Sequence, residues 1–437
     1  VVDEEHDWAY KQDDGLRYQA RDLAAWRARQ SSATLILGSA TPSLESFQRS
    51  KKGLSTLLKM ESRPGSAILP EVVIVDRRQE TKGGRSAISQ PVNNALLQTF
   101  ERGEQALMFI NRRGASALPL CLSCGQTLKC EHCSLTLTLH ADIARPEVEK
   151  RNEDVSRPLL ANSLLVCHGC GYRAFPPSSC PTCGSPLVRY LGVGTEGLTK
   201  LLEKNFKKKG LRLDTDSAKA AGSLKNILES FGRGEADFLV GTQMAAKGHD
   251  FSNLTLVGVI EADLGLNFPD FRAAERTFQL LSQVSGRAGR GERPGLVFIQ
   301  TRNPSHYVME AVKEHNYEAF YKEEIAVREE LGYPPFSRLC LVRFSGPEEK
   351  IVFELARAAA EKGQELIGER KVEELEILGP APSPVSKLKE KYRFQLLLRA
   401  QKAQDRHWIL KLWLPEIRKS LPAEVTLTVD IDPYNMM

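Results

Sequence analysis

The cysteines restrict what this chain can fold into more than any other feature. Eight of its nine cysteines form four Cys-x-x-Cys pairs between residues 121 and 183. One such pair supplies two thiolate ligands from a single turn, and two pairs complete a tetrahedral zinc site. We therefore predict that an insertion over residues 121–187 binds two Zn²⁺ ions. The predicted ligands are Cys121, Cys124, Cys130, Cys133, Cys167, Cys170, Cys180 and Cys183.

The spacing alone does not decide which pairs share a metal ion. We prefer a nested arrangement, in which the first pair joins the fourth and the second joins the third. The long segment between Cys133 and Cys167 is then tolerated as a hairpin excursion. A redox function, known for a single Cys-x-x-Cys motif, is less consistent with four pairs. The ninth cysteine, Cys340, lies in an apolar run and is predicted to be a small buried hydrophobic residue.

The composition excludes several classes of protein. The chain has 437 residues, of which 41% are hydrophobic, and this is enough for a sizeable core. No apolar run approaches the length of a membrane span, and no signal peptide is recognisable. Paired cysteines in such a chain indicate metal binding in a reducing compartment, so we expect a cytoplasmic protein without a membrane partner. The 60 basic residues nearly balance 55 acidic ones, and a net charge of +5 is weak support for a nucleic-acid partner.

The order of the predicted elements indicates an α/β fold. Short apolar runs predict strands, and amphipathic stretches between them predict helices. Such alternation is typical of a parallel sheet with helices on both faces. The predicted strands are 33–38, 72–76, 106–111, 211–214, 238–241, 256–260 and 295–300. The predicted helices are 19–30, 91–102, 195–206, 221–232 and 272–287, followed by one long or two short helices over 305–331.

The pattern changes after residue 330, where a small α+β domain is predicted over residues 331–437. Its predicted strands are 338–345, 393–399 and 425–430, and its predicted helices are 350–368 and 402–419. Basic and aromatic residues interleave in its middle, namely Lys387, Lys389, Lys391, Tyr392, Arg393 and Phe394. Such a stretch suits a nucleic-acid surface. It equally suits the solvated face of an edge strand, and the sequence leaves both interpretations open.

An acidic cluster follows the first apolar residues of the chain. Asp3, Glu4, Glu5 and His6 stand after Val1-Val2, which resembles the end of a buried strand. A carboxylate at a strand end can hold Mg²⁺ through water, and its neighbour can orient a water that attacks a γ-phosphate. Acidic clusters also commonly do no more than face solvent, so these residues alone are a weak signal.

A second motif, GSATPS, occupies residues 38–43 after the predicted strand 33–38. Small hydroxyl residues at such a strand end can connect a nucleotide site to a polymer track. The alternative is an ordinary turn in which Thr41 or Ser43 caps a helix.

The third motif, QVSGRAGR, occupies residues 283–290. Arg287 and Arg290 are three residues apart and would share one face of a helix end. Guanidinium groups placed on a γ-phosphate act as arginine fingers. The alternative is a basic helix C-terminus that complements the helix dipole.

The fourth motif, GTQMAAKGHD, occupies residues 241–250 and follows a predicted strand. Thr242 and Gln243 could contact a phosphate backbone, and Asp250 could reach a nucleotide site. The alternative is a plain connection between strand and helix, with Thr242 as the helix cap.

These four motifs, in this order, resemble motifs II, III, V and VI of the superfamily 2 DExH helicases. With the cysteine insertion, the chain is most similar to the bacterial replication-restart helicases within that superfamily. The resemblance covers essentially all 437 residues. It is carried by VVDEEHDWAYKQ, LGSATPS, FINRRG, the cysteine pairs, GTQMAAKGHDF, DFRAAERTFQLLSQVSGRAGR and YPPFSRL.

The resemblance implies an ATP site shared by two lobes. Asp3 and Glu4 would be the carboxylates for Mg²⁺ and for the attacking water, and His6 would couple them to Gln283. The residues implied to form the catalytic and nucleotide-binding site are Asp3, Glu4, His6, Gln283, Arg287, Arg290, Gly248 and Asp250.

The resemblance also implies a DNA-binding loop. Related helicases keep an aromatic-rich loop where this chain has Trp8, Tyr10 and Tyr18, and bases can stack on such rings. The alternative is that one or two of these rings pack in the core. The implied DNA contacts are Trp8, Tyr10, Lys11, Thr242 and Gln243.

The implied architecture consists of RecA-like helicase lobes, one partial and one complete. Residues 1–60 would be the C-terminal half of the first lobe, and 61–120 with 188–330 the second lobe, followed by the α+β domain. No Gly-Lys dipeptide occurs, so a P-loop of the GxxxxGK[ST] type is absent. Because the chain also begins at Val1 without Met, we expect a truncated protein that cannot hydrolyse ATP by itself.

The function implied is that of an ATP-dependent 3′-to-5′ DNA helicase that recognises stalled or branched forks and starts primosome assembly. The implied cofactors are two Zn²⁺ ions and ATP with Mg²⁺. The implied partners are forked or single-stranded DNA, single-stranded DNA-binding protein, primosome proteins and the replicative helicase loader. An alternative is a non-enzymatic, zinc-containing DNA-binding scaffold, although intact motifs favour a motor. A fork-remodelling DExH helicase is a third reading, against which the cysteine pairs argue.

Overall fold

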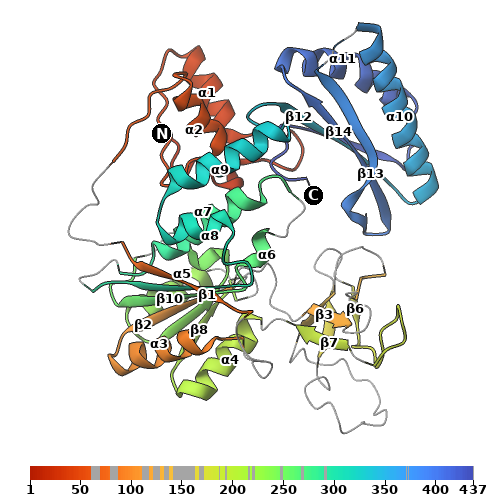
Figure 1. Ribbon diagram of the computed structural model, residues 1–437. Coiled ribbons are helices and arrows are strands. Elements are labelled where there is room, and N and C mark those ends of the chain that lie inside the picture. The colour runs from red at the N-terminus through yellow and green to blue at the C-terminus, as the bar shows by residue number, and fades with distance from the viewer. Residues whose placement is uncertain are drawn as a thin grey trace.

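The computed structural model describes residues 1–60, 69–78, 87–110, 118–121, 128–131, 137–140, 163–166, 172–186, 188–191, 194–214, 217–218, 222–246, 250–266, 270–289, 293–370, 372 and 374–436. These residues form an α/β lobe, a small cysteine-rich module and a C-terminal domain, and the segment 1–60 packs against the lobe (Figure 1). We call these parts the lobe, the module, the C-terminal domain and the N-terminal segment.

The lobe is built on a parallel sheet. Within the described residues its strand order is β1-β11-β10-β2-β9-β8, and every pairing is parallel. Helices cover both faces, so β2 and β10 are uninterrupted runs of buried, mostly apolar residues. This confirms the predicted parallel α/β sheet. The strands are β1 (Glu71–Asp76), β2 (Gln105–Ile110), β8 (Gly210–Leu213), β9 (Phe238–Gly241), β10 (Leu254–Ile260) and β11 (Leu296–Thr301).

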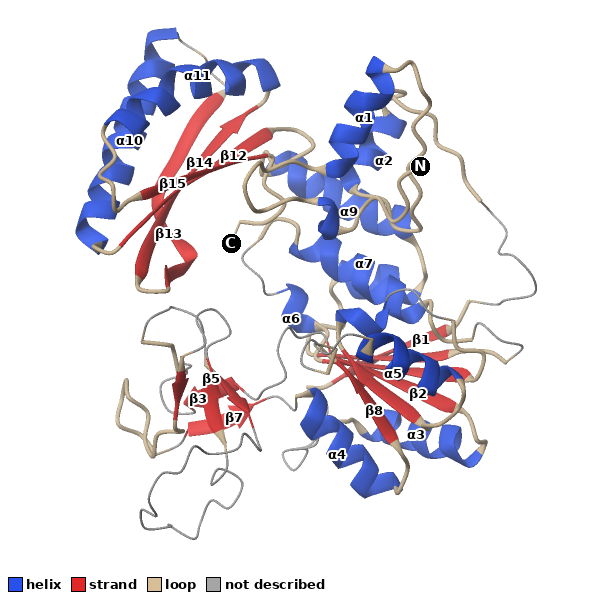
Figure 2. Cartoon of the chain, turned by 180° about the vertical axis from the view of Figure 1, so that it is seen from behind, coloured by secondary structure: helices blue, strands red, loops and turns tan. Residues whose placement is uncertain are grey.

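The sheet divides the core of the lobe into two layers, and helices cover each of them (Figure 2). Val92 of α3 and Leu198 of α4 pack on one face of the sheet. Phe231 of α5 and Phe278 of α7 belong to the core on the other face. The helical elements are α3 (Gln90–Glu101), α4 (Thr195–Phe206), α5 (Ser223–Gly232), η2 (Gln243–Ala246), α6 (Asp263–Leu266), α7 (Ala273–Ser285), α8 (Tyr307–Lys313) and α9 (Tyr317–Glu330).

The stretch 305–331 contains two helices, which decides between the two predicted alternatives. The first, α8, ends before His315, whose φ of 51° is incompatible with a continuing helix. Asn316 then caps α9, because its side chain accepts a hydrogen bond from the backbone N–H of Ala319 at 2.9 Å.

The N-terminal segment departs from the prediction at one point. We expected a buried strand over 33–38, but the structure shows a single parallel bridge between Val2 and Leu37. Ile36 and Leu37 are 56% and 37% exposed, so the prediction of burial was wrong. The side chains of a strand are buried only where other elements pack on the faces of its sheet, and among the described residues the only strand-like pairing of this run is its bridge with Val2. The elements are η1 (Trp8–Tyr10), α1 (Ala20–Gln30) and α2 (Leu44–Lys51).

The module is attached to the lobe by a two-stranded ribbon. Strand β3 (Leu118–Cys121) pairs antiparallel with β7 (Val188–Leu191), so the two ends of the insertion lie side by side. Beyond the ribbon, β4 (Thr138–His140), β5 (Leu164–Val166) and β6 (Arg173–Ala174) form a second small sheet. The predicted excursion over 141–162 lies outside the described residues.

The C-terminal domain is an antiparallel sheet in the order β13-β14-β12-β15, with two helices on one face (Figure 1). Trp413 is fully buried beneath this face and donates from Nε1 to the carbonyl of Ala359 at 2.7 Å. Cys340 is fully buried in the same core, as predicted. The elements are β12 (Arg338–Gly346), α10 (Glu349–Arg370), β13 (Leu375–Leu388), β14 (Lys391–Ala400), α11 (Ala403–Lys419) and β15 (Thr426–Ile431).

Strand β13 was missed because it contains Pro380, Pro382 and Pro384, which argue against a strand. It lies at the edge of the sheet, where one side needs no ladder hydrogen bonds, and this position tolerates proline. None of the helices described has the length and apolarity that a membrane span requires.

Candidate functional site

The first candidate residues form an acidic turn where Val2 leaves its bridge with Leu37. The Asp3 carboxylate accepts a hydrogen bond from the backbone N–H of Glu4 at 2.9 Å. Glu4 has a φ of 45°, an unusual value for a residue with a side chain. A Cβ at Gly38 would lie 3.4 Å from Oδ1 of Asp3, an ordinary van der Waals distance, so the two motifs lie next to each other here. Asp3 and Glu4 present exposed oxygen ligands of the kind that Mg²⁺ prefers.

Glu5 is a buried anchor that sequence reasoning did not single out. Its side chain is 1% exposed and accepts hydrogen bonds from the backbone N–H of Ser43 at 2.6 Å and from Arg21 at 2.9 Å. Ser43 is the cap of α2, since its hydroxyl accepts from the backbone N–H of Ser46. Glu5 therefore fixes the GSATPS motif to the acidic turn, and the predicted Ser43 cap is present.

His6 connects the same two motifs. Its Nδ1 lies 2.7 Å from the Ser39 hydroxyl and 3.6 Å from a carboxylate oxygen of Glu4. Its backbone carbonyl accepts a hydrogen bond from the Tyr434 hydroxyl at 2.5 Å. Among the described residues, the hydrogen bonds and ion pairs of His6 do not include Gln283, the partner that the resemblance implied.

The end of α7 brings two other candidates together. Nη1 of Arg287 lies 3.7 Å from Oδ1 of Asp250, and Arg287 is 9% exposed whereas Asp250 is 69% exposed. The helix ends at Ser285, so Arg287 lies in the following turn and not on the helix face that we predicted. The remaining two candidates of this group, Arg290 and Gly248, lie outside the described residues.

The turn after α7 requires glycine at position 289. The φ of Gly289 is 70°, and a Cβ there would lie 2.4 Å from the backbone nitrogen of Gly295. The turn after α7 therefore packs directly against the start of β11. This close approach fixes where Arg287 leaves the helix.

Thr242 and Gln243 lie at the C-terminal end of β9. The backbone N–H of Thr242 donates to the carbonyl of Leu213 at 3.2 Å, and both side chains are half-buried. Gln243 begins the short helix η2, and the carbonyl of Thr242 accepts from the N–H of Ala245. The carboxyl ends of parallel strands form the usual ligand-binding edge of such a sheet.

The loop predicted to bind DNA has two kinds of residue. Trp8 and Tyr18 are 47% and 42% exposed, and partial exposure is what stacking on a base requires. The Tyr10 hydroxyl instead donates to the backbone carbonyl of Asp3 at 2.8 Å. The ammonium of Lys11 is buried and lies 2.7 Å from Asp430, so a contact of Lys11 with DNA would first require this ion pair to open.

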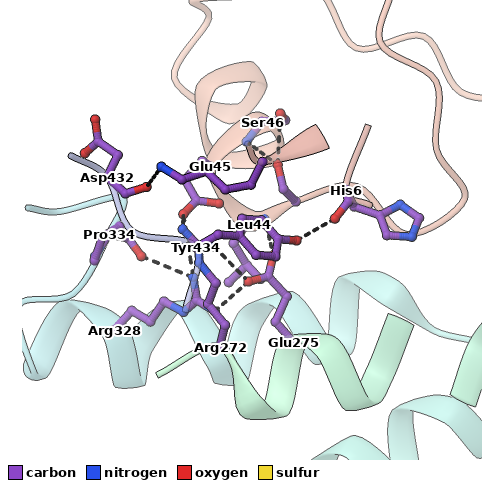
Figure 3. A network of polar contacts seen from close by, with 12 residues as sticks. His6, Leu44, Glu45, Ser46, Arg272, Glu275, Arg328, Pro334, Asp432 and Tyr434 are labelled. Carbon is purple, nitrogen blue, oxygen red and sulfur yellow. Dashed lines mark hydrogen bonds and ion pairs between the residues drawn. The ribbon is translucent and has the colours of Figure 1, made fainter. Parts of the chain in front are cut away.

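A buried network of charges joins the N-terminal segment to the lobe (Figure 3). Arg272, which directly precedes α7, contacts Glu45 of α2 at 2.5 Å and Glu275 of α7 at 3.2 Å. Glu275 also accepts from the backbone N–H of Leu44 at 2.9 Å and from Arg328 of α9 at 2.7 Å. The sequence reasoning did not identify these residues. They hold α2, which begins at the GSATPS motif, against the two helices of the lobe.

The electrostatics of the network follow from burial and pairing. Burial by itself raises the pKa of Glu275, but the neighbouring Arg328 and Arg272 outweigh it, and the net pKa lies below the ordinary value. Glu45 behaves in the same way, because Arg272 and Arg328 reverse the effect of burial and lower its pKa. Both carboxylates are therefore ionised at neutral pH.

The last described residues of the chain pack on this network. Guanidinium groups of Arg272 and Arg276 lie 5.1 and 5.0 Å from the centre of the Tyr434 ring. Arg276 also donates to the backbone carbonyl of Tyr434 and pairs with Asp270 at 3.1 Å. Because the Tyr434 hydroxyl reaches His6, this tail connects the lobe with the acidic turn (Figure 3).

The described part of the module contains only some of the predicted zinc ligands. Cys130 and Cys180 are buried in one small core with Leu128, Leu137, Leu165 and Val188, and Cys183 is exposed. Cys121 ends β3. The other predicted ligands, Cys124, Cys133, Cys167 and Cys170, lie outside the described residues. No group of three or more potential metal ligands occurs among the residues that are described.

The basic and aromatic stretch of the C-terminal domain divides between surface and core. Phe394 is 7% exposed and packs in the core. The ammonium of Lys387 lies 5.0 Å from the ring centre of Tyr392 and 3.3 Å from the backbone carbonyl of Glu131 in the module. The tip of the β13–β14 hairpin thus touches the module as well as solvent.

Comparisons with known proteins give a consistent answer along the chain. Residues 194–292 match the Helicase conserved C-terminal domain, and residues 329–434 match the Primosomal protein N C-terminal domain. The chain is 41% identical to the replication restart protein PriA of Bacillus subtilis, over 100% of the chain and 52% of that protein. The corresponding protein of Synechocystis sp. is 40% identical, over 100% of the chain and 50% of its own length. That of Treponema pallidum is 37% identical, over 100% and 62%. The chain spans about half the length of the first two curated relatives.

The parallel sheet and the match over residues 194–292 define the class of protein, because together they identify an α/β lobe of the RecA-like kind found in helicases. The similarity extends through the C-terminal domain and across the module. The chain belongs to the PriA family of replication restart proteins.

Proposed function

We propose that this chain is part of an ATP-dependent 3′-to-5′ DNA helicase of replication restart, which recognises stalled or branched forks and starts primosome assembly. The observation that carries the proposal is the similarity to replication restart proteins along the whole chain. The intact motifs at strand and helix ends support an active motor. A purely structural protein would have no need of them.

The exposed carboxylates of Asp3 and Glu4 would hold Mg²⁺, which would shield the phosphates of ATP when bound. Glu4 would orient the attacking water. Arg287, followed by Arg290, would place positive charge on the γ-phosphate. In the structure Arg287 is paired with the exposed Asp250, so its guanidinium would exchange this partner for the nucleotide.

The hydrogen bonds of the N-terminal segment suggest how the ATP site would affect the lobe. His6 contacts Ser39, and Glu5 holds Ser43 at the start of α2. The same helix carries Glu45, which is paired with Arg272. A movement of the acidic turn would therefore move α2 against the lobe, because these side-chain contacts connect the turn to α2 and α2 to the lobe. Trp8 would stack on a base of the DNA strand during this movement.

The module would bind two Zn²⁺ ions through its eight paired cysteines, in the nested arrangement if the excursion over 141–162 forms one hairpin. Burial of Cys130 and Cys180 in the module core is consistent with thiolates that stabilise the fold. Single-stranded DNA-binding protein, primosome proteins and the replicative helicase loader would be the protein partners.

The test is the ATPase activity of the whole protein that contains this chain, measured with and without forked DNA. Glu4→Gln should abolish the DNA-stimulated activity, because the amide cannot activate water, and should leave DNA binding intact. The matched control is Glu369→Gln on the exposed surface of α10, which should behave as the unchanged protein. A whole protein that binds forks and two zinc ions but hydrolyses no ATP would refute the motor and favour a scaffold.

A further inference from the structure

Tyrosine hydroxyls hold the backbone of the acidic turn on both sides of Glu4. The Tyr10 hydroxyl donates to the carbonyl of Asp3 at 2.8 Å, and the Tyr434 hydroxyl donates to the carbonyl of His6 at 2.5 Å. Tyr10 belongs to the loop that follows the turn, whereas Tyr434 comes from the other end of the chain (Figure 3). The turn is therefore held partly from outside the N-terminal segment.

Glu4 needs such support because its backbone conformation is unfavourable. Its φ of 45° lies in the left-handed region, which a residue with a side chain adopts only at a cost in free energy. Such conformations persist where the surrounding contacts fix the chain. The N–H of Asp7 donates to the Glu4 carbonyl at 2.7 Å, and Tyr434 holds the residue directly before Asp7. Loss of the bond from Tyr434 would let the turn relax and would displace the Glu4 carboxylate.

The tail, residues 432–436, is anchored to the C-terminal domain and to the lobe. Asp432 directly follows β15, and its φ of 49° is incompatible with a continuing strand. The Asp432 carboxylate accepts a hydrogen bond from Arg406 of α11 at 2.5 Å. At the other end of the tail, the N–H of Met436 donates to the carboxylate of Asp270 in the lobe at 3.2 Å. The tyrosine of the tail lies between these two anchors.

The ring of Tyr434 is held by the lobe independently of its hydroxyl. Guanidinium groups of Arg272 and Arg276 lie 5.1 and 5.0 Å from the ring centre, and Arg276 also donates to the backbone carbonyl of Tyr434. Burial raises the pKa of Tyr434, so the hydroxyl stays protonated at neutral pH and can donate. A substitution that removes only the hydroxyl therefore tests the bond to His6 and keeps the contacts of the ring.

The same end of β15 also holds the loop that follows the acidic turn. The ammonium of Lys11 lies 2.7 Å from a carboxylate oxygen of Asp430. It also donates to the backbone carbonyls of Ile431 and Asp432 at 3.1 and 3.3 Å. Both ends of the stretch from His6 to Lys11 are therefore held by β15 and the tail.

We propose that Tyr434 is a positioning residue of the ATP site, whose hydroxyl fixes the backbone at His6 and thereby holds the Glu4 carboxylate where it orients the attacking water. The proposal rests on the proposed function, since it requires hydrolysis of ATP at the acidic turn. A displacement of a reacting group by about 1 Å can lower the rate about 100-fold. Loss of the bond should therefore lower turnover more than it changes the KM for ATP, because Glu4 acts on the water and not on the bound nucleotide.

The test compares two tyrosine-to-phenylalanine variants of the whole protein that contains this chain. Tyr434→Phe removes the bond to His6. Tyr321→Phe is the matched control, because the Tyr321 hydroxyl donates to Gln48 and so joins the lobe to α2 and not to the turn itself. DNA-stimulated ATPase activity is measured against ATP concentration. We expect Tyr434→Phe to lower kcat about tenfold and to change KM by less than about twofold, and Tyr321→Phe to change neither.

Hydrogen exchange of the 437-residue chain follows the turn without ATP. The amide of Asp7, which donates to the Glu4 carbonyl, should exchange faster in Tyr434→Phe than in the unchanged chain. It should exchange at the unchanged rate in Tyr321→Phe. Arg276→Gln loosens the tail from the lobe and keeps the Tyr434 hydroxyl. This variant replaces Tyr434→Phe, with the same expected results, if urea unfolding shows that Tyr434→Phe does not fold.

Three results would overturn this proposal alone. Equal kcat in Tyr434→Phe and the unchanged protein would show that the hydroxyl does not position the turn. An equal loss of kcat in Tyr434→Phe and Tyr321→Phe would show that reduced stability alone lowers the activity. Unchanged exchange at Asp7 would show that the turn does not depend on the tail. In each case Glu4→Gln still abolishes the ATPase activity, whereas an unchanged protein without ATPase activity would refute both proposals together.

Discussion

Replacing Glu275 by glutamine tests whether the buried charges hold the N-terminal segment on the lobe. The substitution keeps the volume of the side chain, so it creates no cavity. Oε1 can still accept from Leu44, but an amide nitrogen in place of Oε2 would face both Arg328 and Arg272, which contact that oxygen at 2.7 and 3.2 Å. Both arginines would lose a shared countercharge in a site where Glu275 is 2% exposed.

Breaking a buried ion pair by removing one partner costs about 3–5 kcal/mol. We therefore expect Glu275→Gln to lower the free energy of unfolding by roughly this amount, measured from urea unfolding at pH 7. The matched control is Glu354→Gln, which removes the partner of Arg357 on the exposed face of α10. Exposed pairs contribute little, so the control should unfold at the same urea concentration as the unchanged chain.

The pH dependence of the free energy of unfolding tests the same ion pairs a second time. The pKa of Glu275 is lower in the folded state than in the unfolded chain. The contribution of Glu275 to the free energy of unfolding is therefore complete above its unfolded-state pKa and is lost as the pH falls through its folded-state pKa. The unchanged chain should therefore lose stability below about pH 4.5, near the ordinary glutamate pKa, and Glu275→Gln should lose less over that range. Equal stability of Glu275→Gln and Glu354→Gln at pH 7 would refute our account of the network.

Three further results are expected. Tyr434→Phe should lower the free energy of unfolding in urea by about 1 kcal/mol, because the hydrogen bond to the His6 carbonyl is lost. An unchanged midpoint of urea unfolding would show that the ring of Tyr434 alone holds the tail. Cys180→Ser should reduce the zinc content from two ions to one in metal analysis of the purified chain, and an unchanged content would exclude Cys180 as a ligand. Burial raises the pKa of Cys340 to about 12, so a thiol reagent at pH 8 should leave Cys340 unmodified in the folded chain, and mass spectrometry of its peptide would reveal any rapid labelling.

The lobe was predictable because its central strands β2, β9 and β10 are continuous, mostly apolar runs that are buried throughout. Phe238–Gly241 was predicted without error, since Gly241 ends the run where the chain must turn sharply. A Cβ at Gly241 would lie 2.4 Å from that of Ala245. The run over 33–38 is equally apolar, but within the described part of the chain it forms a single bridge and Ile36 and Leu37 stay exposed. Composition does not report which elements will pack beside a run.

The candidate residues that the sequence could suggest are those in local motifs. Asp3, Glu4 and Arg287 were selected from short runs of residue types, and their functional roles stay predictions. The structure places Asp3 and Glu4 after the bridge between Val2 and Leu37, and Arg287 after the end of α7. Glu275 was not identified, because a carboxylate inside a helix gives no sign that its partner Arg328 belongs to another helix. The one available signal is that Glu275 falls on the apolar stripe of α7, where an unpaired charge would be costly.

The hydrogen bond between Tyr434 and His6 joins residues that are 428 positions apart. During synthesis on a ribosome, the acidic turn is therefore made long before the residue that fastens it to the lobe. Contacts of such long range close slowly, because the intervening chain must first be ordered. We therefore expect the N-terminal segment to be the last part to become protected in pulse-labelling hydrogen exchange.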